Sequence, residues 1–318
     1  MAIDQADYGT PRADLGEALM EYINSLSNFI GTQVLPLTEV PVESGNYSAI
    51  TRESLTERAD TKRAAKGAYN RIDLKTKDVS YSCEERGLEA QVDQKDKVRY
   101  KNDFDAEVAQ ARKTLFTTLR EQEIDIAGLV FDAAVWTGAD LYLDVTTVWS
   151  DAAATIIANI ETAKNAVFAN TGMEANALIL NNTVLSMLLT NTQILTRVQG
   201  AQVATMQVML DNLALIFGLE KIFVGKGVYN SKPEGATAFS GTPIWSSSYA
   251  MVAFVPAVNS PIALPAVGRT FLWTEDSPTN IVAESYEEKQ TRSTVVRHRQ
   301  NTDEKIIDEY FGFLLKID

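Results

Sequence analysis

Cysteine and histidine are almost absent from this chain. Cys83 and His298 are the only residues of their types among 318. One cysteine excludes an intrachain disulfide, and one histidine gives little material for a metal site or a histidine-activated nucleophile. We expect His298 to be a solvated histidine on an alternating strand, and Cys83, beside Glu84 and Glu85, to be a passive thiol. The sequence therefore predicts no catalytic residues, no metal and no cofactor.

Several recognisable motifs are also missing. No run of about 18 apolar residues occurs, and the first residues lack a basic start with an apolar stretch, so we expect neither a membrane span nor a signal peptide. No GKS or GKT phosphate loop, HExxH or GxSxG is present. Gly225-Lys226-Gly227 follows a strand-like run, but Asn230 stands where a dinucleotide fingerprint needs a third glycine, which favours a simple turn.

Positive charge is in short supply. The chain has 29 basic and 42 acidic residues, a net charge of −13. A protein that grips DNA by neutralising phosphates needs a basic surface. Tight DNA binding over a broad face is therefore not expected, whereas a container with an acidic or neutral inner wall remains compatible with this balance.

The first hundred residues predict an arm and a flap. Apolar residues recur at helical spacing within 15–26, and Gly31 can end that helix. Pro36 and Pro41 then favour extended chain, and residues 72–82 alternate like a half-exposed strand. Residues 34–82 are thus predicted to form a long two-stranded flap with a charged tip at 51–71, which is marginal alone and needs another surface to lie on.

The basic cluster in this tip leaves three interpretations open: a solvated loop, a surface that docks on an acidic face of a neighbouring copy, or nucleic-acid binding. Nucleic acid is the least favoured, because aromatic residues for base stacking are sparse there. The candidate subunit-contact residues are Arg58, Lys62, Arg63, Lys66 and Arg71.

A long helix and two β-rich regions follow. The apolar rhythm predicts a helix over 103–136, capped by Asp103, interrupted at Gln122 and about 50 Å long. Helix and strand patterns alternate over about 150–265, which indicates a compact α/β unit. The strand-like runs at 269–275, 281–289, 294–300 and 310–317 predict a sheet of long antiparallel strands.

Three segments carry a resemblance to a known family. "VPVESGNYSAI" resembles an arm-to-flap segment, "YSCEERGLE" the return that leads to a spine helix, and "ANTGMEANALILNNTVLSMLLTNTQILTRV" the start of an axial domain. Together with the order of the predicted parts, over nearly the whole chain, they resemble the tailed-bacteriophage major capsid (coat) proteins of the Hong Kong 97-type fold.

That resemblance implies an α+β, Hong Kong 97-like capsid fold with five parts. They are an N-terminal arm (1–35), an extended β-hairpin loop or E-loop with flanking strands (36–100), a peripheral domain with the spine helix (101–150), an α/β axial domain (151–265) and the long antiparallel strands of the peripheral domain (266–318). Gln122 and Gly128 are candidate flex points of the spine; the alternative is that both simply face solvent.

The resemblance also implies a structural protein. The expected subunit is not an enzyme and assembles with itself into pentamers and hexamers of an icosahedral virion head, formed in the host bacterial cytoplasm. Its expected partners are a separate scaffolding protein, a portal protein and, optionally, a decoration protein, with double-stranded DNA enclosed without sequence reading and no membrane contact. The alternatives are an encapsulin-like nanocompartment shell holding a cargo enzyme, and a soluble enzyme with an unrecognised site.

Overall fold

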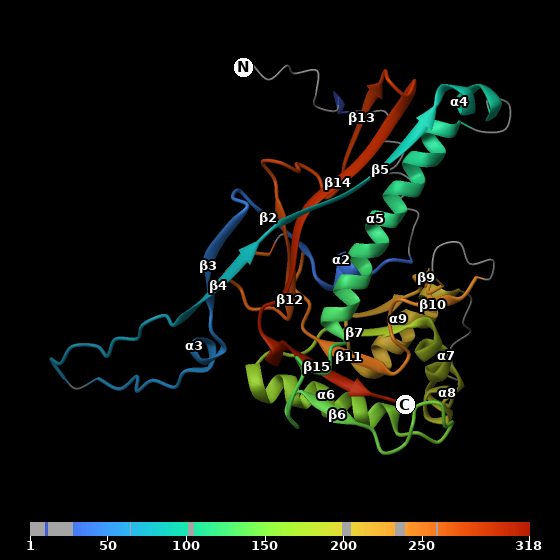
Figure 1. The fold of residues 1–318 in the computed structure, drawn as a ribbon. Helices are drawn as coiled ribbons and strands as arrows, with labels where there is room; N and C mark the ends of the chain where they lie inside the picture. Colours follow the sequence, from blue (N-terminus) through green and yellow to red (C-terminus); the bar gives the residue numbers. More distant parts are fainter. Residues whose placement is uncertain are drawn as a thin grey trace.

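The main parts of the described structure are a six-stranded sheet, a five-stranded sheet with helices packed on it, one long helix and a protruding flap (Figure 1). The computed structural model describes residues 10–11, 28–63, 65–100, 105–198, 205–232, 239–258 and 260–318. The long helix, α5, runs along the first sheet and ends against the second (Figure 1). The predicted α+β class is confirmed.

The first sheet has six strands. Their order in space is β1-β13-β14-β12-β2, and β5 also pairs with β14; every pairing is antiparallel except that of β12 with β2. The strands are β1 (Thr10–Pro11), β2 (Leu37–Val40), β5 (Glu84–Asp93), β12 (Gly268–Trp273), β13 (Val282–Glu288) and β14 (Ser293–Ile306). With 14 residues, β14 spans roughly 45 Å. The predicted long antiparallel strands at 281–289 and 294–300 are therefore confirmed.

The second sheet has five strands in the order β6-β15-β11-β7-β8. They are β6 (Tyr142–Asp144), β7 (Ala177–Asn181), β8 (Lys221–Gly225), β11 (Tyr249–Ala253) and β15 (Gly312–Lys316). We expected 310–317 to join the sheet of long antiparallel strands, and that placement is wrong. A 3₁₀ turn, η2 (Glu309–Phe311), separates β14 from β15, and β15 lies between β11 and β6.

Both faces of the five-stranded sheet are buried. Along β7, Leu178 and Leu180 join one apolar cluster, whereas Ala177 and Ile179 join another. Alternate side chains of a strand point to opposite faces, so this sheet is a central layer. Helical residues of the first cluster come from α6 (Ile156–Thr171), α7 (Asn182–Thr190), α8 (Thr192–Val198) and α9 (Met206–Phe217). The second cluster includes α2 (Gly31–Val34) and the end of α5.

The spine helix is shorter than predicted. α5 spans Ala106–Val130, about 37 Å, and its cap is Asp105. Asp103, which we expected to cap the helix, lies outside the described residues. The carboxylate of Asp105 accepts hydrogen bonds from the amides of Glu107 and Val108 at 2.9 and 3.3 Å. At the other end, the indole Nε1 of Trp136 donates to the carbonyl of Val130 at 2.8 Å. The helical spacing of apolar residues continues in the sequence beyond Val130, because the residues that follow the helix turn back and pack on the same apolar core.

The remaining elements join or flank these layers. They are β3 (Ser44–Ile50), α3 (Arg52–Thr56), β4 (Thr76–Ser82), α4 (Gln94–Tyr100), β9 (Val228–Asn230) and β10 (Gly241–Pro243). The helix predicted within 15–26 lies outside the described residues. Gly31, expected to end that helix, is instead the first residue of α2. Within the described part of the chain, no helix has the length and apolar character needed to cross a membrane.

Candidate assembly surface

The predicted flap is a β-hairpin, but it is shorter than the expected 34–82 and spans 44–82. Residues 34–40 were expected to belong to it and instead lie in the body of the molecule, at the end of α2 and in β2 of the six-stranded sheet, where most of their apolar side chains are buried. β3 and β4 pair antiparallel, from Ser44 opposite Ser82 to Ile50 opposite Thr76. α3 follows β3 directly, because the Thr51 hydroxyl caps it by accepting from the amide of Ser54. Residues 57–75 then form a loop that extends far from both sheets (Figure 1). We call this loop the flap tip.

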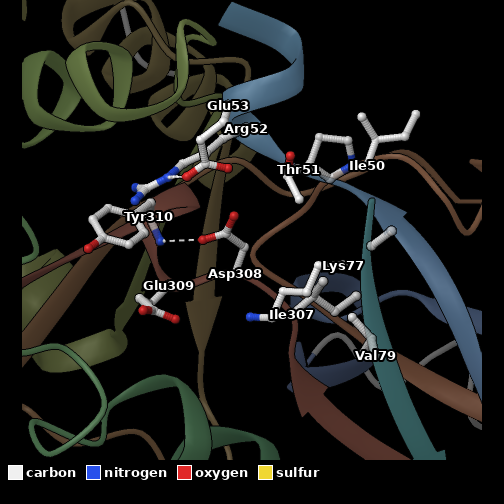
Figure 2. Close-up of a pocket in the computed structure, with 12 residues that line it drawn as sticks. Ile50, Thr51, Arg52, Glu53, Lys77, Val79, Ile307, Asp308, Glu309 and Tyr310 are labelled. Carbon is white, nitrogen blue, oxygen red and sulfur yellow. Dashed lines mark hydrogen bonds and ion pairs between the residues drawn. The ribbon is translucent and has the colours of Figure 1, made fainter. Parts of the chain in front are cut away.

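The root of the flap, by which we mean β3, α3 and β4, contacts the body of its own subunit. The Tyr81 ring stacks on Phe271 with centroids 5.1 Å apart, and the amide of Ser82 donates to Asp303 at 2.8 Å. The guanidinium carbon of Arg52 lies 3.2 Å from the centroid of the Tyr310 ring. Figure 2 shows this contact, together with the bond from the Tyr310 amide to the Asp308 carboxylate, beside a small cleft between the flap root and η2. The root therefore has a defined position.

The flap tip, in contrast, has no cover from its own subunit. Every described residue in 55–63 and 65–78 is exposed. Tyr69, Ile72 and Leu74 are large apolar side chains with exposed fractions of 73%, 61% and 66%. Interactions within the tip are local, such as the Arg63 guanidinium 4.6 Å from the Tyr69 ring centroid. Apolar area left in water at about 25 cal/mol per Å² favours burial against another surface.

The five basic residues predicted as subunit contacts all lie on this tip and are exposed: Arg58, Lys62, Arg63, Lys66 and Arg71. The tip contains six basic and three acidic residues in a chain with a large acidic excess. The apolar part of this surface was missed, because Ile72 and Leu74 were assigned to a half-exposed strand over 72–82, whereas the strand begins only at Thr76. Their contact with a second copy remains a prediction.

The two predicted flex residues of the spine differ in environment. Gly128 is exposed, and a methyl group added there would meet no atom within 4 Å. Gln122 is buried, with 1% of its surface exposed, and its amide donates to Glu304 at 3.1 Å. The alternative that Gln122 faces solvent is therefore wrong. Its polar side chain interrupts the apolar stripe because it pairs with a carboxylate on β14.

The lone histidine is not solvated, contrary to expectation. His298 is fully buried, and its Nδ1 lies 2.6 Å from the hydroxyl of Thr114 on α5. Burial lowers the pKa of His298 from 6.5 to about 4. The imidazole is therefore neutral at neutral pH and enclosed by protein, a position that solvent and substrate do not reach.

Cys83 is also buried. Burial, followed by the charge of Asp303, raises the pKa of its thiol to about 11, which opposes the reactive thiolate form. The described residues contain no cluster of three or more histidine, cysteine, aspartate or glutamate side chains arranged to hold a metal ion.

Comparison with known proteins identifies the fold. No protein-family model matches the chain, and no curated protein matches it. Among solved structures, a phage-related protein from Bordetella bronchiseptica RB50 covers 98% of both chains at 20% identity, with a TM-score of 0.72. The capsid of a native GTA particle covers 100% of this chain and 94% of its own at 10% identity, with a TM-score of 0.57. The chain has the Hong Kong 97-type capsid fold.

A third solved structure of similar fold is a virus-like particle. A virus-like particle from Pyrococcus furiosus covers 96% of this chain and 98% of its own at 13% identity, with a TM-score of 0.57. β3, α3, β4 and the flap tip correspond to the extended β-hairpin loop that the sequence led us to expect, and α5 corresponds to the expected long helix.

Proposed function

We propose that this protein is the major capsid subunit of a tailed bacteriophage, which assembles with itself into a closed icosahedral shell around double-stranded DNA. The observation that carries the proposal is the flap tip, whose apolar and basic side chains have no cover within one copy. When each copy of a subunit offers such a surface to a different surface of the next copy, the contacts are heterologous. They build a closed ring or shell if the rotation between neighbouring copies returns to the first copy. The capsid structures that share the fold support this assignment.

In this proposal, the subunit forms pentamers and hexamers in the bacterial cytoplasm, guided by a separate scaffolding protein and joined by a portal protein. A decoration protein is an optional addition. DNA is held by enclosure, because the acidic balance of the chain does not suit a broad phosphate-binding face. The subunit is a structural protein and not an enzyme.

A loop replacement tests the role of the flap tip. Glu57 and Lys75 lie at its two ends, and their side chains form an ion pair at 3.2 Å. A short Gly-Ser linker can therefore replace 58–74 without moving α3 or β4. We expect closed particles from the unchanged protein, by negative-stain microscopy with and without a scaffolding protein, and only unassembled subunits from the variant.

The control for this experiment is the stability of the unassembled variant. An unchanged urea midpoint shows that the body still folds, since the tip makes only local contacts. Normal shells from the shortened protein would refute the docking role of the tip. Nuclease-protected double-stranded DNA in the particles supports a phage head, whereas a co-purifying cargo enzyme would favour the nanocompartment instead.

A further inference from the structure

A buried carboxylate joins three separate segments of the chain. Glu123 lies on α5 with 3% of its surface exposed. Its Oε1 accepts hydrogen bonds from the amide of Ile30 at 2.8 Å and from the indole Nε1 of Trp245 at 2.6 Å. Its Oε2 accepts from the amide of Gly31 at 2.6 Å. Both oxygens thus accept from N–H donors, which offset part of the cost of burying the carboxylate.

Three glycines allow the segments to approach this closely. A Cβ on Gly31 would stand 2.5 Å from the Glu123 carboxylate, and one on Gly225 would stand 2.1 Å from the Trp245 ring. A Cβ on Gly227 would stand 2.8 Å from the Ile244 side chain. The Gly225-Lys226-Gly227 turn therefore serves packing around the Glu123 site.

The Glu123 site also lies where the two halves of the molecule meet. The first half of α5 packs on the six-stranded sheet, where Ala111 and Leu115 contact Val296 of β14. Just beyond Glu123, Ile126 belongs to the cluster that covers the five-stranded sheet, together with Ile30 and Trp245. Figure 1 shows α2 beside this part of α5, between the two sheets.

We propose that Glu123 is a positioning residue that fastens the chain at Ile30–Gly31 and the loop bearing Trp245 to the spine helix, and so fixes the orientation of one sheet relative to the other. This role belongs to the single subunit and does not depend on shell formation. Apolar contacts alone would tolerate sliding, because they are not directional, whereas three hydrogen bonds to one carboxylate define one geometry.

Amide hydrogen exchange of the unassembled subunit tests the proposal. Glu123→Gln keeps the size of the side chain but replaces one oxygen by an NH₂ group, which faces an N–H donor in either orientation. We expect exchange at the amides of Ile30 and Gly31 to become about tenfold faster, with the amides of β7 unchanged. The matched control is Glu121→Gln, which alters an exposed carboxylate of the same helix.

A second variant separates the link to Trp245 from general damage. Trp245→Phe removes the indole donor together with part of the buried ring, and keeps a smaller ring against Gly225. We expect faster exchange at Ile30 and Gly31 than in the unchanged protein, but slower than in Glu123→Gln. Unchanged protection of these two amides in Glu123→Gln, or an equal loss of protection in β7, would overturn the proposal.

If shells form, particle size gives a second readout, separate from hydrogen exchange. This readout rests on the proposed function. A subunit whose two sheets are less firmly oriented should build shells of mixed diameter, seen by negative-stain microscopy of Glu123→Gln beside Glu121→Gln. Uniform shells from Glu123→Gln would contradict the orienting role. Absence of shells from the unchanged protein would count against the capsid function only, since the exchange experiment needs no assembly.

Discussion

His298 is enclosed by three elements, the preceding strand β13 and two that are distant in the sequence, β5 and α5. In the sheet it pairs with Ala283 of β13 on one side and Leu88 of β5 on the other, while Thr114 of α5 covers its face. Its Nε2 has no hydrogen-bond partner among the described residues. Protonation would therefore place a charge in a buried site without a compensating acceptor.

This environment predicts that acid destabilises the subunit through His298. The pKa of His298 is about 4 in the folded protein, whereas an unperturbed histidine, as in the unfolded chain, has a pKa of 6.5. As the pH falls, the unfolded chain therefore binds the proton at a higher pH than the folded protein does. Stability contributed by neutral His298 is complete above about pH 6.5 and is lost as the pH falls towards 4, by about 3 kcal/mol. Urea unfolding of the unassembled protein across this range measures the loss, and His298→Asn should show a shallower pH dependence.

The comparison with His298→Asn isolates this group from the other titrating ones. Burial raises the pKa of Glu123 and of Asp308, so these two carboxyls act in the opposite direction, stabilising the fold as the pH falls. Both are present in the variant and in the unchanged protein. Equal pH slopes for the two proteins would contradict the assignment to His298.

At the scale of elements, α5 contacts the six-stranded sheet partly through polar groups. Buried polar residues of the helix meet alternate residues of β14, as in the pairs Thr114–His298 and Gln122–Glu304. These residues are Thr114, Thr118 and Gln122 on α5 and His298, Gln300, Thr302 and Glu304 on β14. The alternation of polar and apolar residues along β14 led us to expect that its polar face is exposed. That expectation was wrong, because α5 covers the polar face.

The cap of α5 gives a prediction at the same scale. Asp105→Ala removes the acceptor for two helix amides and should lower the free energy of unfolding by about 1 kcal/mol. Asp105→Asn should recover most of this loss, because an asparagine oxygen can also cap. The control is Glu121→Ala, which changes an exposed carboxylate within the same helix. Equal losses of stability in the two alanine variants, measured by urea unfolding, would contradict the capping role of Asp105.

The sequence predicted elements better than it predicted their partners. Periodicity and local chemistry were sufficient for the long helix α5, the long strands β13 and β14, and the hairpin of β3 and β4. The sheet that receives β15 depends on pairing with β11, which no local pattern encodes. The Glu123 site was missed for the same reason, since Ile30, Glu123 and Trp245 meet only in the folded chain.

At the scale of the whole molecule, the charge distribution is uneven in a way that bears on assembly. The flap tip has a basic excess, whereas the chain as a whole has 42 acidic residues against 29 basic ones. A second copy therefore carries a net negative charge, which attracts the basic tip. Attraction between exposed charges is screened over about 8 Å at physiological ionic strength, so its contribution falls as salt is added.

Two flap-tip variants should therefore respond differently to salt. Replacing Arg58, Lys62, Arg63, Lys66 and Arg71 by glutamine removes the basic excess and should slow assembly most at low salt, with the difference from the unchanged protein shrinking as salt rises. Replacing Tyr69, Ile72 and Leu74 by serine removes the exposed apolar groups, and its defect should persist at high salt, because hydrophobic association is not screened. Light scattering during assembly measures both rates, and matching salt profiles for the two variants would show that the tip does not dock through separable charged and apolar contacts.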